Sequence, residues 1–88
     1  MKTNYEYPID YDWTREEMLA VIELLQVVEQ AYEGGVASKQ ILSKYQVYKK
    51  YFKAILDEKM LDRDFKKVSG YSMYQVIKKA RENDFVRL

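Results

Sequence analysis

A long central helix is predicted by residues 14–35, whose sequence is T-R-E-E-M-L-A-V-I-E-L-L-Q-V-V-E-Q-A-Y-E-G-G. Thr14 and Glu17 have the spacing of a capping box, in which each side chain accepts a hydrogen bond from the other residue's backbone amide. Apolar residues then recur every three or four positions and cover most of the helix circumference, which is typical of a helix at the centre of a fold. Gly34 and Gly35 should end it, one of them in the left-handed conformation.

Three shorter amphipathic helices should follow the central one. Together the four are predicted near residues 15–33, 39–53, 57–68 and 73–83. The apolar pattern of the second continues into the third, but one helix over residues 39–67 would be ~43 Å long. Since a domain of this size has a radius of gyration of only ~12 Å, we expect a break near residues 53–57.

Capping residues and inner faces can be assigned to these three helices. Ser38 and Asp57 are the expected N-caps of the second and third helices, and Gly70 should end the third. Ser72 and Gln75 form a second capping box. The side chains expected to face the core are Ile41, Tyr45, Tyr48, Phe52 and Ile55 in the second helix, Met60, Leu61, Phe65 and Val68 in the third, and Met73, Val76, Ile77 and Ala80 in the fourth.

The N-terminal segment has a different period, because large apolar side chains occupy every second position at Tyr5, Tyr7, Ile9, Tyr11 and Trp13. A single strand has no sheet partner in a helical chain, and the proline at position 8 favours extended backbone while removing a hydrogen-bond donor. We therefore interpret residues 4–13, called the strap below, as an extended segment that lies across the helices. Its odd-numbered side chains should face the core and its even-numbered acidic ones the solvent. Pairing with the strap of another molecule and an aromatic shelf for a ligand are the alternatives.

The whole chain is expected to be one all-α domain over residues 1–88, a compact bundle or irregular array of about four helices. Residues 1–13 form the extended strap, 14–84 the helices and 85–88 a tail. The chain contains no cysteine and no histidine, which excludes disulfides, transition-metal sites and histidine-assisted nucleophiles. We expect no cofactor. No apolar run is long enough to span a membrane, and acidic residues stand where a signal peptide would be basic, so a cytoplasmic protein is predicted.

Charges are segregated along the chain, with acidic residues dominating positions 1–35 and basic ones positions 36–88. The simpler interpretation is that an acidic first helix packs beside basic later ones. The alternative is a basic face that binds an anionic partner. The candidate partner-contact residues lie on the outer side of the second and fourth helices, provided those helices are neighbours: Lys49, Lys50, Lys53, Lys78, Lys79 and Arg81.

Paired acidic residues are candidates for acid–base chemistry, and each pair also has an ordinary structural use. The pairs are Asp10/Asp12, Glu16/Glu17, Asp57/Glu58 and Asp62/Asp64. Glu29 is unusual because it falls on the inward stripe of the first helix, and a buried carboxylate must be paired or protonated. We expect it to bond a tyrosine hydroxyl or a strap amide; a carboxylic acid with a raised pKa is the functional alternative. No catalytic residue is assigned.

Several stretches in their order and spacing resemble one protein family. They are residues 5–10 (YEYPID), 13–14 (WT), 17–18 (EM), 28–36 (VEQAYEGGV) and 69–74 (SGYSMY). On these residues the chain is similar to uncharacterised protein family 0223, the small YktA-like proteins of Gram-positive bacteria. The resemblance covers nearly the whole chain. It implies a compact helical domain and brings no activity, cofactor or catalytic residue.

A non-catalytic binding or adaptor module is the function that these features favour. It would act through a protein partner or through self-association, with no membrane and no small-molecule substrate, because a chain this small has little volume left for a pocket after it packs a core. The alternative is a nucleic-acid-associated accessory protein that uses lysines beside exposed tyrosines such as Tyr51 and Tyr74.

Overall fold

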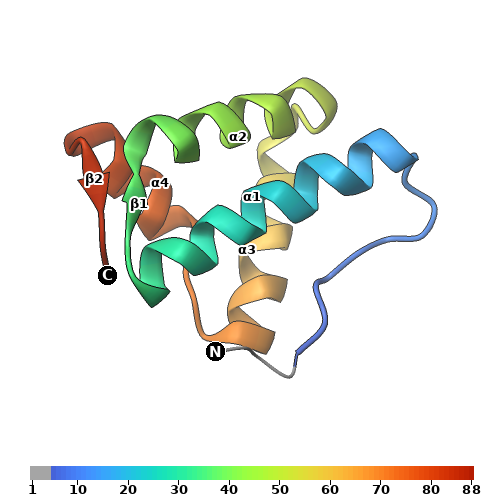
Figure 1. The fold of residues 1–88 in the computed structure, drawn as a ribbon. Coiled ribbons are helices and arrows are strands. Elements are labelled where there is room, and N and C mark those ends of the chain that lie inside the picture. The colour runs from blue at the N-terminus through green and yellow to red at the C-terminus, as the bar shows by residue number, and fades with distance from the viewer. Residues whose placement is uncertain (1–4) are drawn as a thin grey trace.

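Four helices form the domain, and a computed structural model describes residues 5–88 (Figure 1). In chain order the elements are α1 (Arg15–Glu33), β1 (Val36–Ala37), α2 (Ser38–Tyr51), α3 (Ile55–Ser69), α4 (Met73–Glu82) and β2 (Phe85–Val86). The helical class and the four predicted helices are confirmed, with ends shifted by at most two residues. The Cα radius of gyration is 12.1 Å.

Helix α1 lies in the middle of the fold, as its apolar circumference predicts. The Thr14 hydroxyl accepts from the Glu17 amide at 3.1 Å and the Glu17 carboxylate accepts from the Thr14 amide at 2.8 Å, which confirms the capping box. At the other end the amides of both glycines donate to the Gln30 carbonyl. Gly35 has a positive φ, 111°, which other residues rarely adopt, and a Cβ there would stand 2.5 Å from the Phe85 ring and displace it.

Helices α2 and α3 are separated by a break at residues 52–54, slightly before its predicted place. Phe52 is the C-cap of α2 and turns its ring back into the core. The N-cap of α3 is Ala54, so the expectation that Asp57 would cap this helix is wrong. Asp57 lies in the first turn instead, where its negative charge suits the positive end of the helix dipole.

Two of the other predicted caps are confirmed and one is wrong. Gly70 ends α3 in the left-handed conformation, with φ 80°. The Ser72 hydroxyl accepts from the Gln75 amide at 3.2 Å, which is half of the predicted capping box of α4. Ser38 does not cap α2, because Ala37 is the N-cap. Ser38 is instead the first helical residue and its amide donates to the Asp84 carbonyl, which draws the C-terminal segment onto the start of α2.

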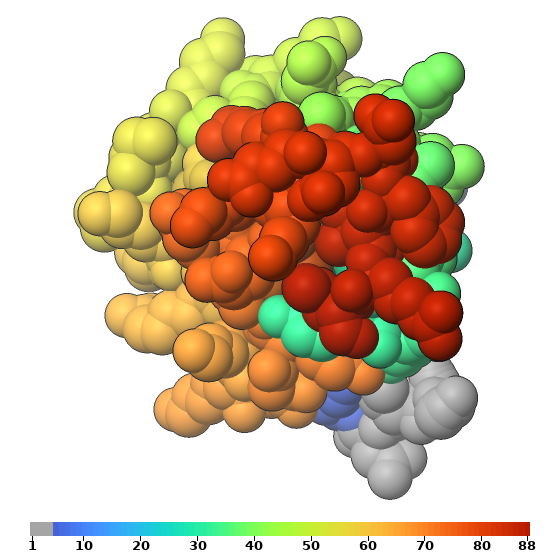
Figure 2. All heavy atoms as spheres, turned by 90° about the vertical axis from the view of Figure 1, so that its left-hand side faces the viewer, coloured from blue at the N-terminus to red at the C-terminus, as the bar shows by residue number. Residues whose placement is uncertain are grey.

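The C-terminal segment is an edge of a small sheet and not a free tail. Strand β2 pairs antiparallel with β1, with Val86 opposite Val36, and the Leu88 amide donates to the Ala31 carbonyl of α1 at 2.8 Å. Val36 and Val86 are both buried by this pairing. The prediction of a tail at residues 85–88 is therefore wrong. Figure 2 shows α4 and this segment covering one face of the molecule, with α2 above them and α3 below.

The core is built around α1 and receives a narrow stripe from each of the other helices. The inner face of α4 is buried as predicted, and so are Ile41, Tyr48, Phe52, Leu61 and Phe65. Three residues expected in the core are exposed: Ile55, Met60 and Val68. The apolar spacing puts Ile55 on the stripe of the second helix, but the break changes the helical phase before that residue and Ile55 begins α3. Helix α3 lies on the outside of the bundle, and only two of its side chains, Leu61 and Phe65, are buried against the core.

The strap crosses the helices in extended form without joining a sheet, as expected for its described part, residues 5–13. Tyr5, Tyr7, Ile9 and Trp13 pack against the core, whereas Tyr11 is 85% exposed and the prediction for it is wrong. A turn breaks the alternation there. The Trp13 amide donates to the Asp10 carbonyl at 3.0 Å and the Asp12 amide to the Asp10 carboxylate at 2.9 Å. The prediction for residues 1–4 lies outside the described residues.

Candidate binding groove

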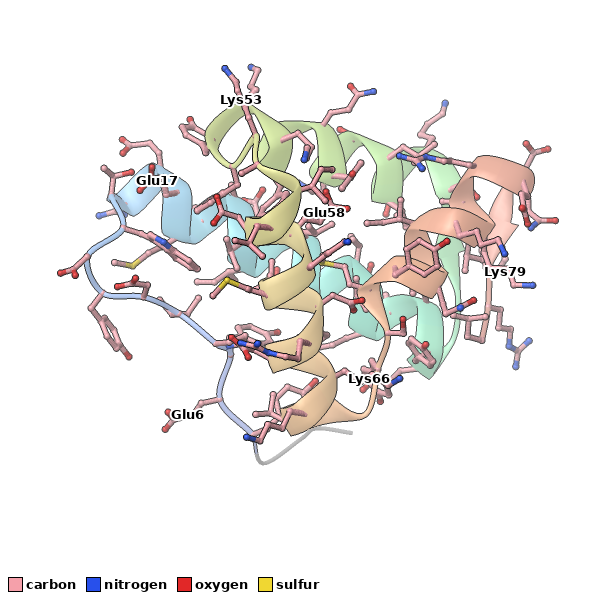
Figure 3. The ribbon with its side chains drawn as sticks, turned by 180° about the vertical axis from the view of Figure 1, so that it is seen from behind. Glu6, Glu17, Lys53, Glu58, Lys66 and Lys79 are labelled. Atoms are coloured by element: carbon pink, nitrogen blue, oxygen red, sulfur yellow. The ribbon has the colours of Figure 1, made fainter. Side chains whose placement is uncertain are left out.

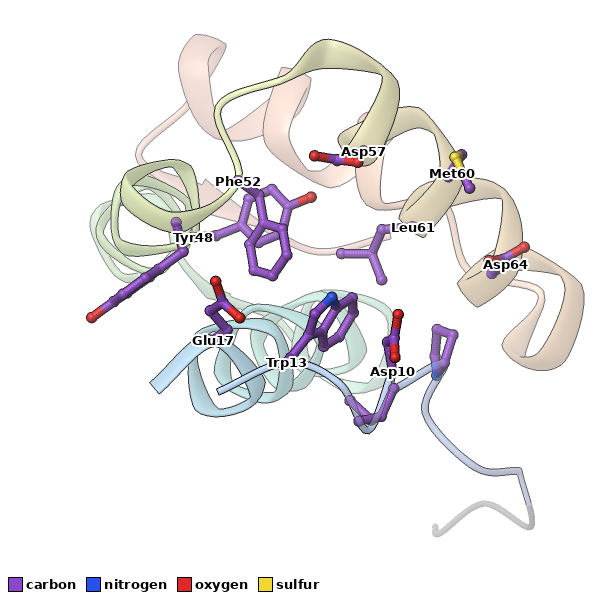
Figure 4. Close-up of a pocket in the computed structure, with 12 residues that line it drawn as sticks. Asp10, Trp13, Glu17, Tyr48, Phe52, Asp57, Met60, Leu61 and Asp64 are labelled. Atoms are coloured by element: carbon purple, nitrogen blue, oxygen red, sulfur yellow. The ribbon is translucent and has the colours of Figure 1, made fainter. Parts of the chain in front are cut away.

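A groove of about 640 Å³ opens between the strap, the start of α1, the end of α2 and one face of α3 (Figure 4). Its lining residues are Pro8, Ile9, Asp10, Trp13, Glu17, Tyr48, Tyr51, Phe52, Asp57, Met60, Leu61 and Asp64. This volume lies within the range of ligand-binding sites, roughly 300–1,000 Å³. The expectation that the chain leaves little room for a pocket is therefore wrong. The strap forms one wall of the groove opposite α3, so the groove lies between the strap and the helices and takes no volume from the helical core.

The inner part of the groove is aromatic. The rings of Trp13 and Phe52 meet edge to face, with centroids 5.1 Å apart and an interplanar angle of 69°. Tyr48 stacks on Phe52 at 4.9 Å. Figure 4 shows Trp13, Phe52 and Leu61 directed into the hollow from three different elements. The floor is therefore a rigid aromatic surface, because every ring in it is fixed by a neighbouring ring.

The rim of the groove carries four carboxylates and, among the lining residues, no lysine or arginine. Asp10 and Glu17 stand on the side of the strap and α1, and Asp57 and Asp64 stand on α3 (Figure 4). The Asp64 carboxylate is 3.2 Å from the exposed guanidinium of its neighbour Arg63. Asp57 has no hydrogen bond or ion pair to any residue in 5–88. Asp57 is therefore the one rim carboxylate without a partner among the described residues, while Asp10 and Glu17 accept backbone amides and Asp64 pairs with Arg63.

A tyrosine–carboxylate cluster fixes the far end of the strap. The Tyr7 hydroxyl donates to Glu29 Oε1 at 2.6 Å, and the Tyr5 hydroxyl donates to the other oxygen of the same carboxylate. The prediction that Glu29 bonds a tyrosine hydroxyl is confirmed. Burial and the hydrogen bond to this carboxylate raise the pKa of Tyr7. Both rings also pack against Phe65, with centroids 5.8 Å and 6.1 Å away.

A second polar cluster joins α2, α3 and α4. The Tyr45 hydroxyl donates to both oxygens of Glu58, at 3.0 Å and 2.9 Å. Lys49 Nζ lies 3.0 Å from the same carboxylate, and the Arg81 guanidinium lies 5.6 Å from the centre of the Tyr45 ring. Burial and the hydrogen bond to Glu58 raise the pKa of Tyr45. Two of the candidate partner-contact residues therefore contact side chains of the fold: Lys49, which is half-buried, and Arg81, which is exposed.

The other four candidate contact residues, Lys50, Lys53, Lys78 and Lys79, are exposed. Helices α2 and α4 pack against each other, which meets the condition set for a shared surface. In Figure 3 Lys53 projects from the break between α2 and α3 at the top of the view, and Lys79 from α4 at its right-hand edge. The simpler interpretation of the segregated charges also has a direct example, because Lys44 of α2 pairs with Glu23 of α1 at 3.2 Å.

Several of the carboxylates considered for acid–base chemistry have structural hydrogen bonds. Asp10 and Glu17 accept from backbone amides near the start of α1, and Glu58 accepts from Tyr45. Asp62 accepts from the Met73 amide at 2.9 Å and so caps the start of α4 from α3. Within residues 5–88 no group of three acidic side chains is placed to hold a metal ion.

Alkaline pH should destabilise the fold, because the pKa values of Tyr7, Tyr45, Tyr48 and Tyr71 are all raised. A hydrogen bond to Glu33, followed by burial, raises the pKa of Tyr71 to about 12. A raised value in the folded state means that the stabilisation is complete below the unfolded value of 10.0 and is lost as pH rises from there through about 12. Urea unfolding at neutral pH and at about pH 11 should therefore give a lower midpoint at the higher pH.

Tyr71→Phe provides the specific comparison for this pH dependence. It removes the hydroxyl whose pKa is raised, so its midpoint should fall less between the two pH values than that of the parent chain. Tyr11→Phe is the matched control, since Tyr11 is exposed and should leave the fall unchanged. If the urea midpoint falls by the same amount in the parent chain and both variants, the Tyr71 hydroxyl does not contribute to the pH dependence.

The sequence pattern does not predict the groove, although part of its signal is present. Asp57, Met60, Leu61 and Asp64 have the spacing of one helical face, and this face carries two acidic and two apolar side chains. The strap wall opposite could not be placed against it without the tertiary structure.

None of the helices in the described part of the chain has the length and apolar character needed to cross a bilayer.

Comparison with known proteins places the chain in one family. The model of "Uncharacterised protein family (UPF0223)" matches residues 4–87. A UPF0223 protein of Streptococcus equi subsp. equi is 44% identical over 93% of this chain and 89% of its own length. Relatives in Streptococcus mutans and Bacillus cytotoxicus are 43% and 36% identical over 100% and 91% of this chain, and 98% and 90% of their own lengths. The chain therefore belongs to uncharacterised protein family 0223, the family that its sequence resembles.

Proposed function

We propose that this chain is a non-catalytic, cytoplasmic protein-binding module whose contact surface is the groove and the apolar edge beside it. One observation carries the proposal: apolar side chains line the groove and continue out of it into solvent. Tyr51 and Met60 line the groove and are 43% and 42% exposed. Leu56 is 66% exposed and lies one turn before Met60 on α3. Contiguous exposed apolar surface of this kind is typical of protein interaction sites.

A protein segment suits this surface better than a small molecule does. A small ligand is usually enclosed over most of its surface. Here the groove is bordered on one side by the strap and on the other by a helix whose exposed side chains extend beyond it. A partner that fills the groove and also covers Leu56 must be longer than a compact ligand. The absence of histidine and cysteine from the sequence and the structural hydrogen bonds of most carboxylates support a module that binds without catalysis.

Site-specific photo-crosslinking tests the proposal in the native cytoplasm. With a photoreactive residue in place of Leu56, we expect one discrete crosslinked partner, which then binds the purified chain in a saturable titration. The same residue in place of Tyr74, which is 59% exposed on α4, should not capture that partner.

A pair of matched variants distinguishes specific binding at the groove from nonspecific binding to exposed apolar surface. Leu56→Gln with Met60→Gln removes apolar surface at the groove, and Val68→Gln with Tyr74→Gln removes exposed apolar surface elsewhere. Both variants should melt at the parent temperature, because all four side chains are exposed. Only the first should lose the titrated partner. Equal loss in both, or crosslinking that is equally strong from position 74, would contradict the proposal.

A nucleic-acid-associated role is the second candidate, and the exposed lysines beside two exposed tyrosines favour it. Tyr51 is flanked in the chain by Lys50 and Phe52, and Tyr74 lies one turn before Lys78 on α4. Phosphate contacts would make binding fall steeply with added salt, roughly in proportion to the number of contacts. Reversing the charge at Lys50, Lys53 and Lys78 together would abolish binding of this kind, or of an acidic protein, and Lys49 is left in place because it pairs with Glu58. The groove variants would leave it intact.

A further inference from the structure

We infer that the groove binds a cationic side chain, an arginine or lysine, of a basic segment in the partner protein. This inference rests on the proposed function and specifies the chemistry of its partner. The cation would lie against the Trp13 and Phe52 rings and pair with carboxylates on the rim. The inference starts from a combination of two features at one place: an aromatic floor and a rim with no positive charge among its lining residues.

The aromatic floor can attract a cation. The face of a tryptophan ring is the best aromatic surface for a guanidinium or ammonium group, and the attraction grows when the site is shielded from water. Trp13 is half-buried, and its neighbours Phe52 and Tyr48 are buried, so the ring is fixed before any ligand arrives. The apolar stem of an arginine or lysine would meanwhile contact Ile9 and Leu61, as such stems commonly cover apolar surface.

The rim supplies the complementary charge. Asp57 and Asp64 occupy positions i and i+7 of α3, on the same face as Met60 and Leu61, and so stand along one wall. Asp57 has no ionic partner among the described residues, and Asp64 meets only an exposed arginine next to it in the chain. Asp10 stands on the opposite wall. A cation in the groove therefore faces carboxylates from both sides.

The same charge arrangement argues against other occupants. An acidic segment or a phosphate group would meet like charge on both walls. A purely apolar segment would cover the floor but would leave the rim carboxylates partly desolvated without a partner. A basic residue with apolar neighbours satisfies the floor, the rim and the exposed edge formed by Tyr51 and Leu56 together.

The test uses the full chain and two short acetylated peptides of leucine and alanine that differ only at one central residue. That residue is arginine in the first peptide and citrulline, its neutral near-isostere, in the second. Trp13 is the only tryptophan, so its fluorescence reports directly on the groove. We expect saturable binding of the arginine peptide and about tenfold weaker binding of the citrulline peptide. Added salt should weaken binding of the arginine peptide and leave binding of the citrulline peptide nearly unchanged.

Two double variants locate the charge. Asp57→Asn with Asp64→Asn should weaken the arginine peptide by about three- to tenfold and leave the citrulline peptide unchanged. Glu6→Gln with Asp12→Asn is the matched control, because both carboxylates are exposed on the strap outside the groove, and it should change neither affinity. Thermal melting checks that all variants remain folded.

Each result decides the inference independently of the proposed function. Equal binding of the two peptides, equal effects of the two double variants, or no saturable binding of the arginine peptide overturns the cation site. A Trp13 signal that changes with protein concentration alone also overturns it, since a second copy would then fill the groove. The crosslinking at position 56 tests the proposed function separately. If a partner is captured there but the groove shows no preference for arginine, the protein-binding proposal is supported and only the cation site is overturned.

Discussion

Deletion of residues 1–12 should lower the free energy of unfolding by about 3–6 kcal/mol and leave a molten or aggregating chain. Tyr5, Tyr7 and Ile9 pack on the core, and the two hydroxyls supply the hydrogen bonds of Glu29. Without them this carboxylate, which is half-buried on α1, loses both tyrosine partners. The whole stability of a domain this size is about 4–13 kcal/mol. Urea unfolding and near-ultraviolet circular dichroism would measure the loss.

Tyr11→Ala is the matched control for the strap. Its side chain is exposed, so the substitution should change stability by less than about 0.5 kcal/mol. A second variant, Tyr5→Phe with Tyr7→Phe, keeps the rings and removes only the hydroxyls, so that it separates packing from the Glu29 hydrogen bonds. If the truncated chain melts cooperatively at the parent temperature, the strap is not structural and its aromatic residues must serve a partner.

Phe65→Ala should be the most damaging single substitution in α3, at about 3–5 kcal/mol. The side chain is fully buried, and its ring is surrounded by Tyr5, Tyr7 and Tyr71. Truncation would remove the surface against which the strap rings pack and would leave a cavity under them. Chemical denaturation would give the free energy, and the loss of strap packing should appear in the tyrosine signals of the NMR spectrum.

Val68→Ala tests the same helix at a position where the pattern and the structure disagree. The apolar spacing places Val68 in the core with Phe65, whereas its side chain is 42% exposed. We expect a change below about 1 kcal/mol. A cost as large as that of Phe65→Ala would mean that α3 is rotated about its axis relative to the structure described above.

The helices could be predicted because their signals are local. The capping box at Thr14, the positive φ at Gly70 and the inner face of α4 depend on residues three or four positions apart. Errors occur where a tertiary contact replaces a local signal. Ser38 looks like an N-cap, but its amide is taken by the Asp84 carbonyl and Ala37 caps the helix. The error at Tyr11 has a local cause instead, because the alternating pattern of the strap hides a turn that begins at Asp10.

Features formed by distant segments could not be predicted in the same way. The β1–β2 pair has only two residues on each side, too short for a recognisable strand pattern. The groove needs the strap and α3 to face each other across Trp13 and Phe52, and no periodicity relates those segments. Glu29 was the exception. A carboxylate on an apolar stripe requires a partner, and a tyrosine hydroxyl is one of the two partners expected for it.

The two ends of the described chain meet the same helix, and this has a consequence for folding rate. Tyr7 reaches Glu29 across 22 positions from one side, and the Leu88 amide reaches the Ala31 carbonyl from the other. Helical domains usually fold quickly because their contacts are local, and each long-range contact adds loop-closure entropy to the barrier. The helices of this protein can form early. We expect the strap and the β-pair to dock afterwards on a helix that already exists, so that the groove, whose wall is the strap, is completed last.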